Sequence, residues 1–92
     1  MKIMVTWTFK AGGLRGAVEQ FLAGQGAAPE GTKLLGRWHS SDFSGGFALY
    51  ETNDTVAIFE GAAVWAEVID LRHIPVVEDA EAGPVLAKAF GK

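Results

Sequence analysis

The sequence predicts an α+β fold that combines a four-stranded antiparallel sheet with two crossover helices and a C-terminal helix. Two observations predict the strands: apolar residues alternate along residues 2–9, and two β-rich runs flank the turn residues 41–45. A third predicts the helices, because apolar residues after positions 13 and 54 recur every three or four residues. With 92 residues, the chain is expected to form a single domain, residues 1–92.

The first strand and the first helix follow from the spacing of apolar residues. Along residues 2–9, one alternating set is Ile3, Val5, Trp7 and Phe9, and the other is Met4, Thr6 and Thr8. Both sets suit a strand with at least one buried face. The next stripe has helical spacing and consists of Leu14, Ala17, Val18, Phe21 and Leu22. Gly24 and Gly26 are expected to end this helix.

A β-hairpin is expected next, with strands at residues 33–40 and 46–52. The segment between them, Ser-Asp-Phe-Ser-Gly, has turn chemistry. A second helix should begin at Asn53 or Asp54, because either side chain can accept a hydrogen bond from the first turn. Its apolar stripe is Ile58, Ala62, Trp65 and Ile69.

The last two predicted elements are a strand at residues 68–77 and a C-terminal helix. Pro75 favours an edge or strand-end position, because proline cannot donate a hydrogen bond to a neighbouring strand. Asp79 and Glu81 suit the start of the final helix, and Pro84 is expected in its first turn. The apolar side of this helix is Val85, Leu86, Ala89 and Phe90. The resulting βαββαβ order is that of a ferredoxin-like domain.

Composition excludes several classes of partner and site. A net charge of −3 and a pI near 5.2 argue against binding to nucleic acid or to an anionic membrane, since both require clustered basic residues. No apolar run is long enough to span a membrane, and we expect no signal peptide. Cysteine is absent, and only His39 and His73 can offer imidazole to a metal. We therefore expect a cytoplasmic protein without a metal or other cofactor.

The apolar content favours a homodimer. Hydrophobic residues make up 49% of the chain, including three Trp and six Phe. Two helices can cover only one face of a four-stranded sheet, whereas both alternating sets of the first strand look buried. A second copy is expected to cover the other face.

Six sequence patterns carry a resemblance to a known family. They are Met-Val-Thr-Trp at 4–7, Leu-Leu-Gly-Arg-Trp-His at 34–39, Gly-Gly-Phe-Ala-Leu at 45–49, Trp65, Asp70, and Leu-Ala-Lys-Ala-Phe-Gly at 86–91. Through them the chain resembles, over nearly its whole length, a family of short bacterial proteins of unknown function. The resemblance implies membership of the dimeric α/β-barrel superfamily, whose members include small monooxygenases, cyclases, lactone isomerases and haem-degrading enzymes. Such an analogy predicts architecture better than chemistry.

Arg37 and His39 are the candidate catalytic residues. They lie two apart in a predicted strand, so both should project from one sheet face while Trp38 takes the other. A fixed cation beside an imidazole can orient a carboxylate, enolate or phenolate and exchange a proton near neutral pH. The alternative is structural: Arg37 pairs with a carboxylate such as Glu51, and His39 closes the hairpin end.

The candidate ligand-binding residues are mostly aromatic: Thr6, Trp7, Trp38, Phe47, Trp65 and Asp70. The aromatic rings can line a pocket for a flat apolar molecule, with Thr6 or Thr8 orienting it. Asp70 is a possible general base only by analogy with the superfamily. Ordinary core packing is the alternative for each ring.

Three functions remain open. The first is a cofactor-independent enzyme of the monooxygenase, cyclase or isomerase type that acts on an apolar aromatic or polyketide-like molecule. The second is a non-catalytic ligand-binding or regulatory dimer with the same cavity, and the third is an interaction module without a ligand. RNA binding is disfavoured, because residues 43–50 lack the basic residue and first aromatic of an RNA-recognition strand.

Overall fold

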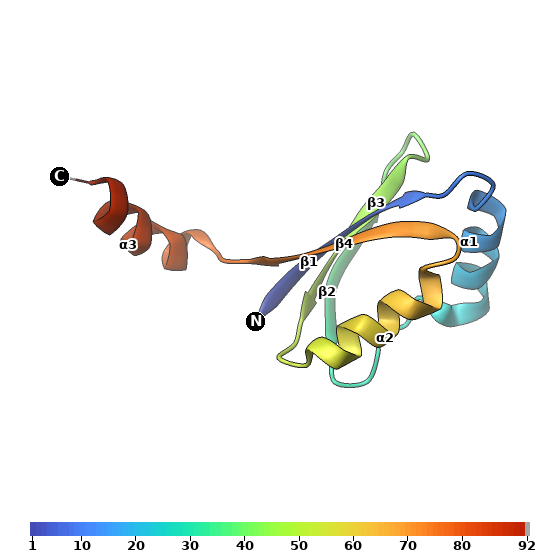
Figure 1. Cartoon of the computed structure of the whole chain (residues 1–92), viewed down its shortest axis with the longest axis horizontal. Helices are drawn as coiled ribbons and strands as arrows, with labels where there is room; N and C mark the ends of the chain where they lie inside the picture. Colours follow the sequence, from blue (N-terminus) through green and yellow to red (C-terminus); the bar gives the residue numbers. More distant parts are fainter. Residues whose placement is uncertain (92) are drawn as a thin grey trace.

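A computed structural model describes residues 1–91 (Figure 1). The elements within these residues are β1 (Lys2–Phe9), α1 (Leu14–Gln20), the π-helical turn η1 (Phe21–Gln25), β2 (Lys33–His39), β3 (Gly45–Glu51), α2 (Thr55–Trp65), β4 (Ile69–Val76) and α3 (Asp79–Phe90). The strands form an antiparallel sheet in the order β2-β3-β1-β4. This confirms the predicted α+β, ferredoxin-like fold.

The sheet is built around β1, which pairs with β3 on one side and β4 on the other. β1 has the bounds that its alternation predicts, and β2 and β3 differ from the prediction by one residue at their ends. β4 lies at an edge of the sheet, as Pro75 predicts. A bulge between Leu34 and Gly36 interrupts the pairing of β2 with β3.

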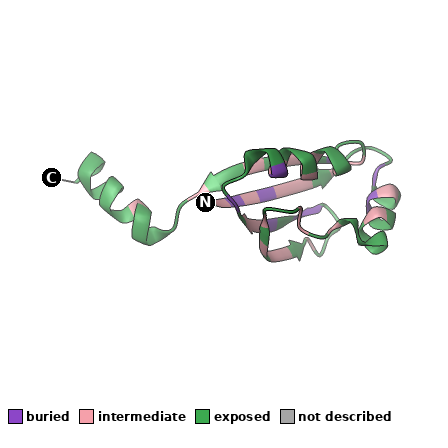
Figure 2. Cartoon of the chain, turned by 90° about the horizontal axis from the view of Figure 1, so that it is seen from below, coloured by how far each residue is buried: buried purple, intermediate pink, exposed green. Residues whose placement is uncertain are grey.

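Helices α1 and α2 lie on the same face of the sheet (Figures 1 and 2). Asp54 caps α2, since its Oδ1 accepts a hydrogen bond from the backbone N–H of Ala57 at 3.1 Å. The prediction that the stripe of α2 continues to Ile69 is wrong. The helix ends at Trp65, and Ile69 begins β4 after the Val68 N–H donates to the Trp65 carbonyl. Gly24 ends the first helical segment with a φ of 88°, as expected.

The core is small. Its buried centre is Ile3, Val5 and Ala48, and the partly buried side chains packed against it are Trp7, Leu34, Tyr50, Ile58 and Leu71. Among residues 1–91, no large side chain is fully buried. The space between the helices and the sheet is therefore incompletely filled by the chain itself.

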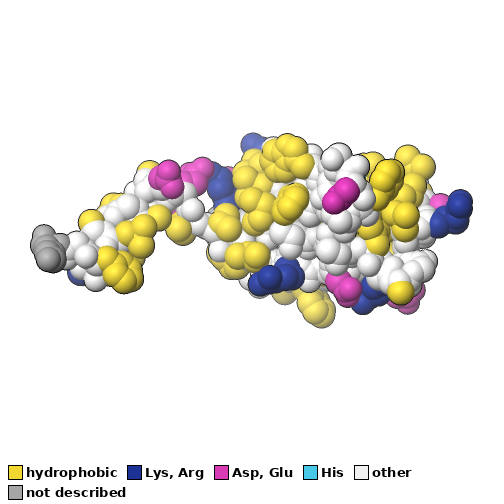
Figure 3. Space-filling model, turned by 90° about the horizontal axis from the view of Figure 1, so that it is seen from above, with side chains coloured by type: hydrophobic (Ala, Val, Ile, Leu, Met, Phe, Trp, Pro, Cys, Tyr) yellow, Lys and Arg dark blue, Asp and Glu magenta, His cyan; other side chains and the backbone are white. Residues whose placement is uncertain are grey.

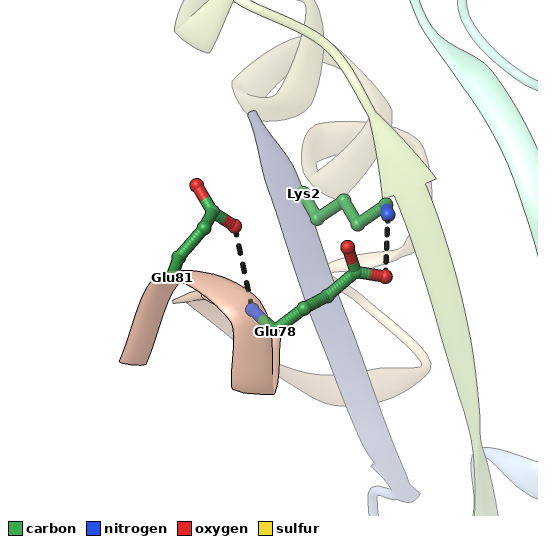
Figure 4. A network of polar contacts seen from close by, with 3 residues as sticks. All are labelled: Lys2, Glu78 and Glu81. Carbon is green, nitrogen blue, oxygen red and sulfur yellow. Dashed lines mark hydrogen bonds and ion pairs between the residues drawn. The ribbon is translucent and has the colours of Figure 1, made fainter. Parts of the chain in front are cut away.

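Helix α3 projects away from the rest of the molecule as an arm (Figure 1). A reciprocal capping box between Glu78 and Glu81 fixes its start, and Lys2 Nζ donates to Glu78 Oε1 at 2.8 Å (Figure 4). Glu78 raises the pKa of the Lys2 ammonium through this bond. The prediction that Pro84 lies in the first turn is wrong. The capping box starts the helix at Asp79, which places Pro84 in the second turn.

The arm leaves its apolar side chains uncovered (Figures 2 and 3). Val85, Leu86 and Phe90 are all exposed, Phe90 by 82%. The whole chain exposes 6582 Å² and has a radius of gyration of 15.5 Å. A compact protein of this mass exposes about 5,200 Å² and has a radius near 12 Å. The excess of roughly 1,400 Å² comes from an extended shape.

The sheet face away from α1 and α2 also exposes large apolar side chains, beside the charged residues Asp70 and Arg72. We call it the open face; it carries Met4, Thr6 and Thr8 of β1 together with their cross-strand neighbours. Among these neighbours Phe47 and Ile74 are exposed, and Trp38, opposite Phe47, is 56% exposed. Within the described range, no helix is long and apolar enough to cross a membrane.

Candidate functional site

A pocket of about 430 Å³ lies between the sheet and the helices α1 and α2. Its floor is the helix-side face of the sheet, which carries Val5 and Trp7 of β1 and their cross-strand neighbours. Its walls come from α1, η1, α2 and the loop before β2. The volume is within the range of pockets that hold small molecules.

Strand register sets the polar groups of the floor in defined rows. In one row, His73, Val5, Ala48 and Arg37 lie side by side across β4, β1, β3 and β2. In the next row, the corresponding residues are Leu71, Trp7, Gly46 and His39. Ala48 is small and lines the pocket, so β3 leaves space above the first row, whereas in the second row the Trp7 ring lies over Gly46.

Arg37 is half-buried in this pocket. One of its terminal nitrogens, Nη2, donates to the carbonyl of Gly26 and to the Tyr50 hydroxyl, the latter at 3.2 Å. Its guanidinium carbon lies 5.5 Å from the centroid of the Phe21 ring. Across residues 1–91, no carboxylate lies within ion-pair distance of Arg37. The proposed pairing with Glu51 is absent, because Glu51 lies opposite Lys33 and Lys2 on the other face.

His39 lies between two aromatic rings. Its imidazole makes edge-on contacts with Trp7, at a centroid distance of 5.8 Å, and with Phe21, at 5.2 Å. The side chain is exposed to solvent and also lines the pocket. Arg37 and His39 therefore share one face of the sheet, as their spacing predicts, and both line this cavity.

His73 lines the same pocket from the opposite edge of the sheet. Burial lowers the pKa of its imidazole below the ordinary value of 6.5. The neutral form, which can both donate and accept a hydrogen bond, is therefore favoured at neutral pH.

The remaining expected site residues divide between the two faces of the sheet. Trp7 and Trp65 line the pocket. Thr6, Trp38, Phe47 and Asp70 belong to the open face, where Thr6, Phe47 and Asp70 border a second, smaller hollow. Asp70 is paired there with Lys10 at 2.6 Å. The structure thus does not bring all eight expected residues into one site.

Sequence reasoning missed Tyr50 and Phe21 as neighbours of Arg37. Tyr50 is two residues from Ala48, so both side chains lie on the same face of β3. Tyr50 also pairs with Ile3, and this register places that face on the helix side of the sheet. Phe21 was expected only as part of an apolar helix stripe. Its contact with Arg37 depends on the turn η1, which the stripe does not specify.

The arrangement can hold a flat molecule and supply a positive charge to it. Two acidic side chains, Glu30 and Glu60, also line the pocket, but both are exposed and therefore screened by water. Arg37 is less exposed, so its charge dominates the interior. In the part of the chain that the structure describes, no three His, Asp or Glu side chains are grouped as metal ligands.

Comparisons with known proteins show the family of this chain. A search of curated proteins and a search of solved structures each found no significant match. The family model described as "Domain of unknown function (DUF3303)" matches residues 1–90, which is nearly the entire chain. The chain therefore belongs to the DUF3303 family.

Proposed function

We propose that this protein binds a small aromatic molecule with an acidic or phenolic oxygen, and that it does so in the pocket between sheet and helices. The observation that carries the proposal is Arg37, a half-buried cation in an aromatic-walled cavity with no carboxylate partner in residues 1–91. A guanidinium in such surroundings interacts more strongly with an anion than it does in water.

Each part of the pocket has a role in this proposal. Tyr50 and the Gly26 carbonyl occupy Nη2 of Arg37 and hold the side chain in place, which leaves its other N–H groups for a ligand oxygen. His39 acts as donor or acceptor beside the same oxygen. Trp7 and Trp65 contact the faces or edges of the ligand's rings.

The activity that fits this pocket is cofactor-independent turnover of an aromatic or polyketide-like molecule, as in the monooxygenases, cyclases and isomerases of the dimeric α/β-barrel superfamily. His39 then accepts the proton that the substrate's phenol or enolizable carbon releases, and Arg37 stabilises the negative oxygen that remains on the substrate. The alternative is a non-catalytic ligand-binding or regulatory dimer. The two functions are distinguished by incubating the protein with a phenol or an enolizable ketone. An enzyme forms a product, and His39→Gln should lose product formation while it still binds the molecule. A binding protein forms no product.

Binding is tested with two rigid probes, 2-naphthoate and neutral 2-naphthalenemethanol, by tryptophan fluorescence. We expect 2-naphthoate to bind roughly tenfold more tightly, because a hydrogen bond to a charged group contributes about 1.5 kcal/mol or more. Arg37→Met should abolish this preference. Arg72→Met is the matched control, since Arg72 lies on the open face. Equal affinity for both probes in the wild type, or the same loss in both variants, contradicts the proposal.

We also propose that the protein is a homodimer that buries the open face and the arm. Its exposed surface exceeds that of a compact monomer by roughly 1,400 Å², while a stable interface takes about 800 Å² from each partner. A second copy presents the same apolar surfaces and is therefore a self-complementary cover.

Sedimentation at micromolar concentration should give twice the 9.8 kDa mass of the chain. The double variant Leu86→Glu/Phe90→Glu should weaken the dimer by roughly tenfold or more, because both side chains belong to the apolar side of the arm. Leu22→Glu is the control, as Leu22 is also an exposed apolar residue but lies on η1. A wild-type chain that sediments as a monomer contradicts this proposal.

A further inference from the structure

We infer that the pocket recognises an elongated ligand with polar groups at both ends, the acidic one at Arg37 and a hydroxyl or carbonyl at His73. This inference rests on the proposed function, because it assigns the second end of the same pocket. Its basis is the row His73–Val5–Ala48–Arg37, which crosses the entire sheet on the helix side.

The distance between the two ends selects the length of the ligand. Arg37 and His73 lie on the two edge strands, three strand spacings or roughly 14 Å apart at the backbone. Their side chains shorten this span, and the floor between them consists of Val5 and Ala48. A single ring that reaches Arg37 leaves His73 unmatched, whereas two or more fused rings can reach both.

The chemistry of the two ends differs. At the Arg37 end the site offers a permanent cation, a phenol hydroxyl and an exposed imidazole. At the His73 end it offers one imidazole on the floor, flanked along β4 on the same face by Leu71 and Pro75. A neutral imidazole in apolar surroundings prefers a neutral hydrogen-bonding partner, because an ionic one loses more hydration there.

Two naphthoates that differ by one hydroxyl test this inference. The probes are 2-naphthoate and 6-hydroxy-2-naphthoate, whose carboxylate and hydroxyl stand at opposite ends of two fused rings. We expect the hydroxyl to raise affinity by about fivefold in the wild type, as one neutral hydrogen bond does. His73→Leu should bind the two naphthoates with equal affinity, and His73→Gln should retain part of the gain.

The possible outcomes separate this inference from the proposed function. If 2-naphthoate binding depends on Arg37 but the hydroxyl adds nothing, or its gain survives in His73→Leu, the second polar end is refuted and the proposed function stands. If neither naphthoate binds the wild type, both fail. Arg72→Met, next to His73 in sequence but on the open face, should show the full hydroxyl gain.

Discussion

Replacing Gly46 with Ala is expected to destabilise the fold by about 3 kcal/mol, the upper part of the range for overpacking a core. A Cβ at this position would lie 2.5 Å from the backbone oxygen of Trp38 and 2.7 Å from Cη2 of Trp7. Neither contact is relieved by a side-chain rotation alone, because one partner is backbone and Trp7 is packed against the core. Urea unfolding followed by circular dichroism measures the change.

The matched control is Gly36→Ala on the neighbouring strand. Its Cβ would meet Trp38 Cη2 at 2.5 Å, a similarly short contact. The indole of Trp38 is exposed on the open face, however, and can swing away. We expect a loss below about 1 kcal/mol in the monomer. Comparable losses in the two variants would mean that Trp7 is not fixed over Gly46.

The same contacts explain the glycines in two of the sequence patterns, Gly-Arg-Trp-His at 36–39 and Gly-Gly-Phe-Ala at 45–48. In Gly-Arg-Trp-His and Gly-Gly-Phe-Ala, the glycines Gly36 and Gly46 each lie beneath a tryptophan ring, Trp38 and Trp7 respectively. Gly45 has a φ of 152° and lies so close to the Trp7 carbonyl that no Cβ fits. These glycines therefore allow two tryptophans to pack closely on opposite faces of the sheet.

Local patterns predicted the elements well where one local rule decides the structure. The alternation in residues 2–9 gives the bounds of β1, and the predicted cap at Asn53 or Asp54 gives the start of α2 to within one residue. The errors occur where two rules compete. Ile69 fits the helix stripe and also the strand, and Pro84 fits a first turn until the capping box at Glu78 fixes an earlier start.

The site was harder to predict. Alternation shows which residues of one strand share a face, but it does not show which face of one strand lies on the same side of the sheet as a given face of the next strand. Trp7 and Trp38 are both aromatic positions in alternating strands, yet they lie on opposite sides of the sheet. Matching them requires the register, in which Trp7 lies opposite Gly46 and Trp38 opposite Phe47. The same missing information concealed the position of His73 in the pocket.

Trp38→Glu is expected to raise the dissociation constant of the proposed homodimer by roughly a hundredfold or more. Trp38 and Phe47 lie side by side on the open face, and Trp38 is the larger exposed ring. Removing an interface tryptophan usually costs at least about 2 kcal/mol, and an unpaired carboxylate in its place adds a desolvation penalty. Sedimentation velocity across a concentration series measures the change.

Leu22→Glu is the control for this substitution, because it adds the same charge at an exposed apolar position of η1. It should leave the dissociation constant within a few-fold of the wild type. If the Trp38→Glu protein dimerises normally, the open face is not part of the proposed interface, and the arm is the remaining candidate contact. Since Trp38 does not line the pocket, binding of 2-naphthoate per chain should persist in the dissociated variant if each chain holds a complete site.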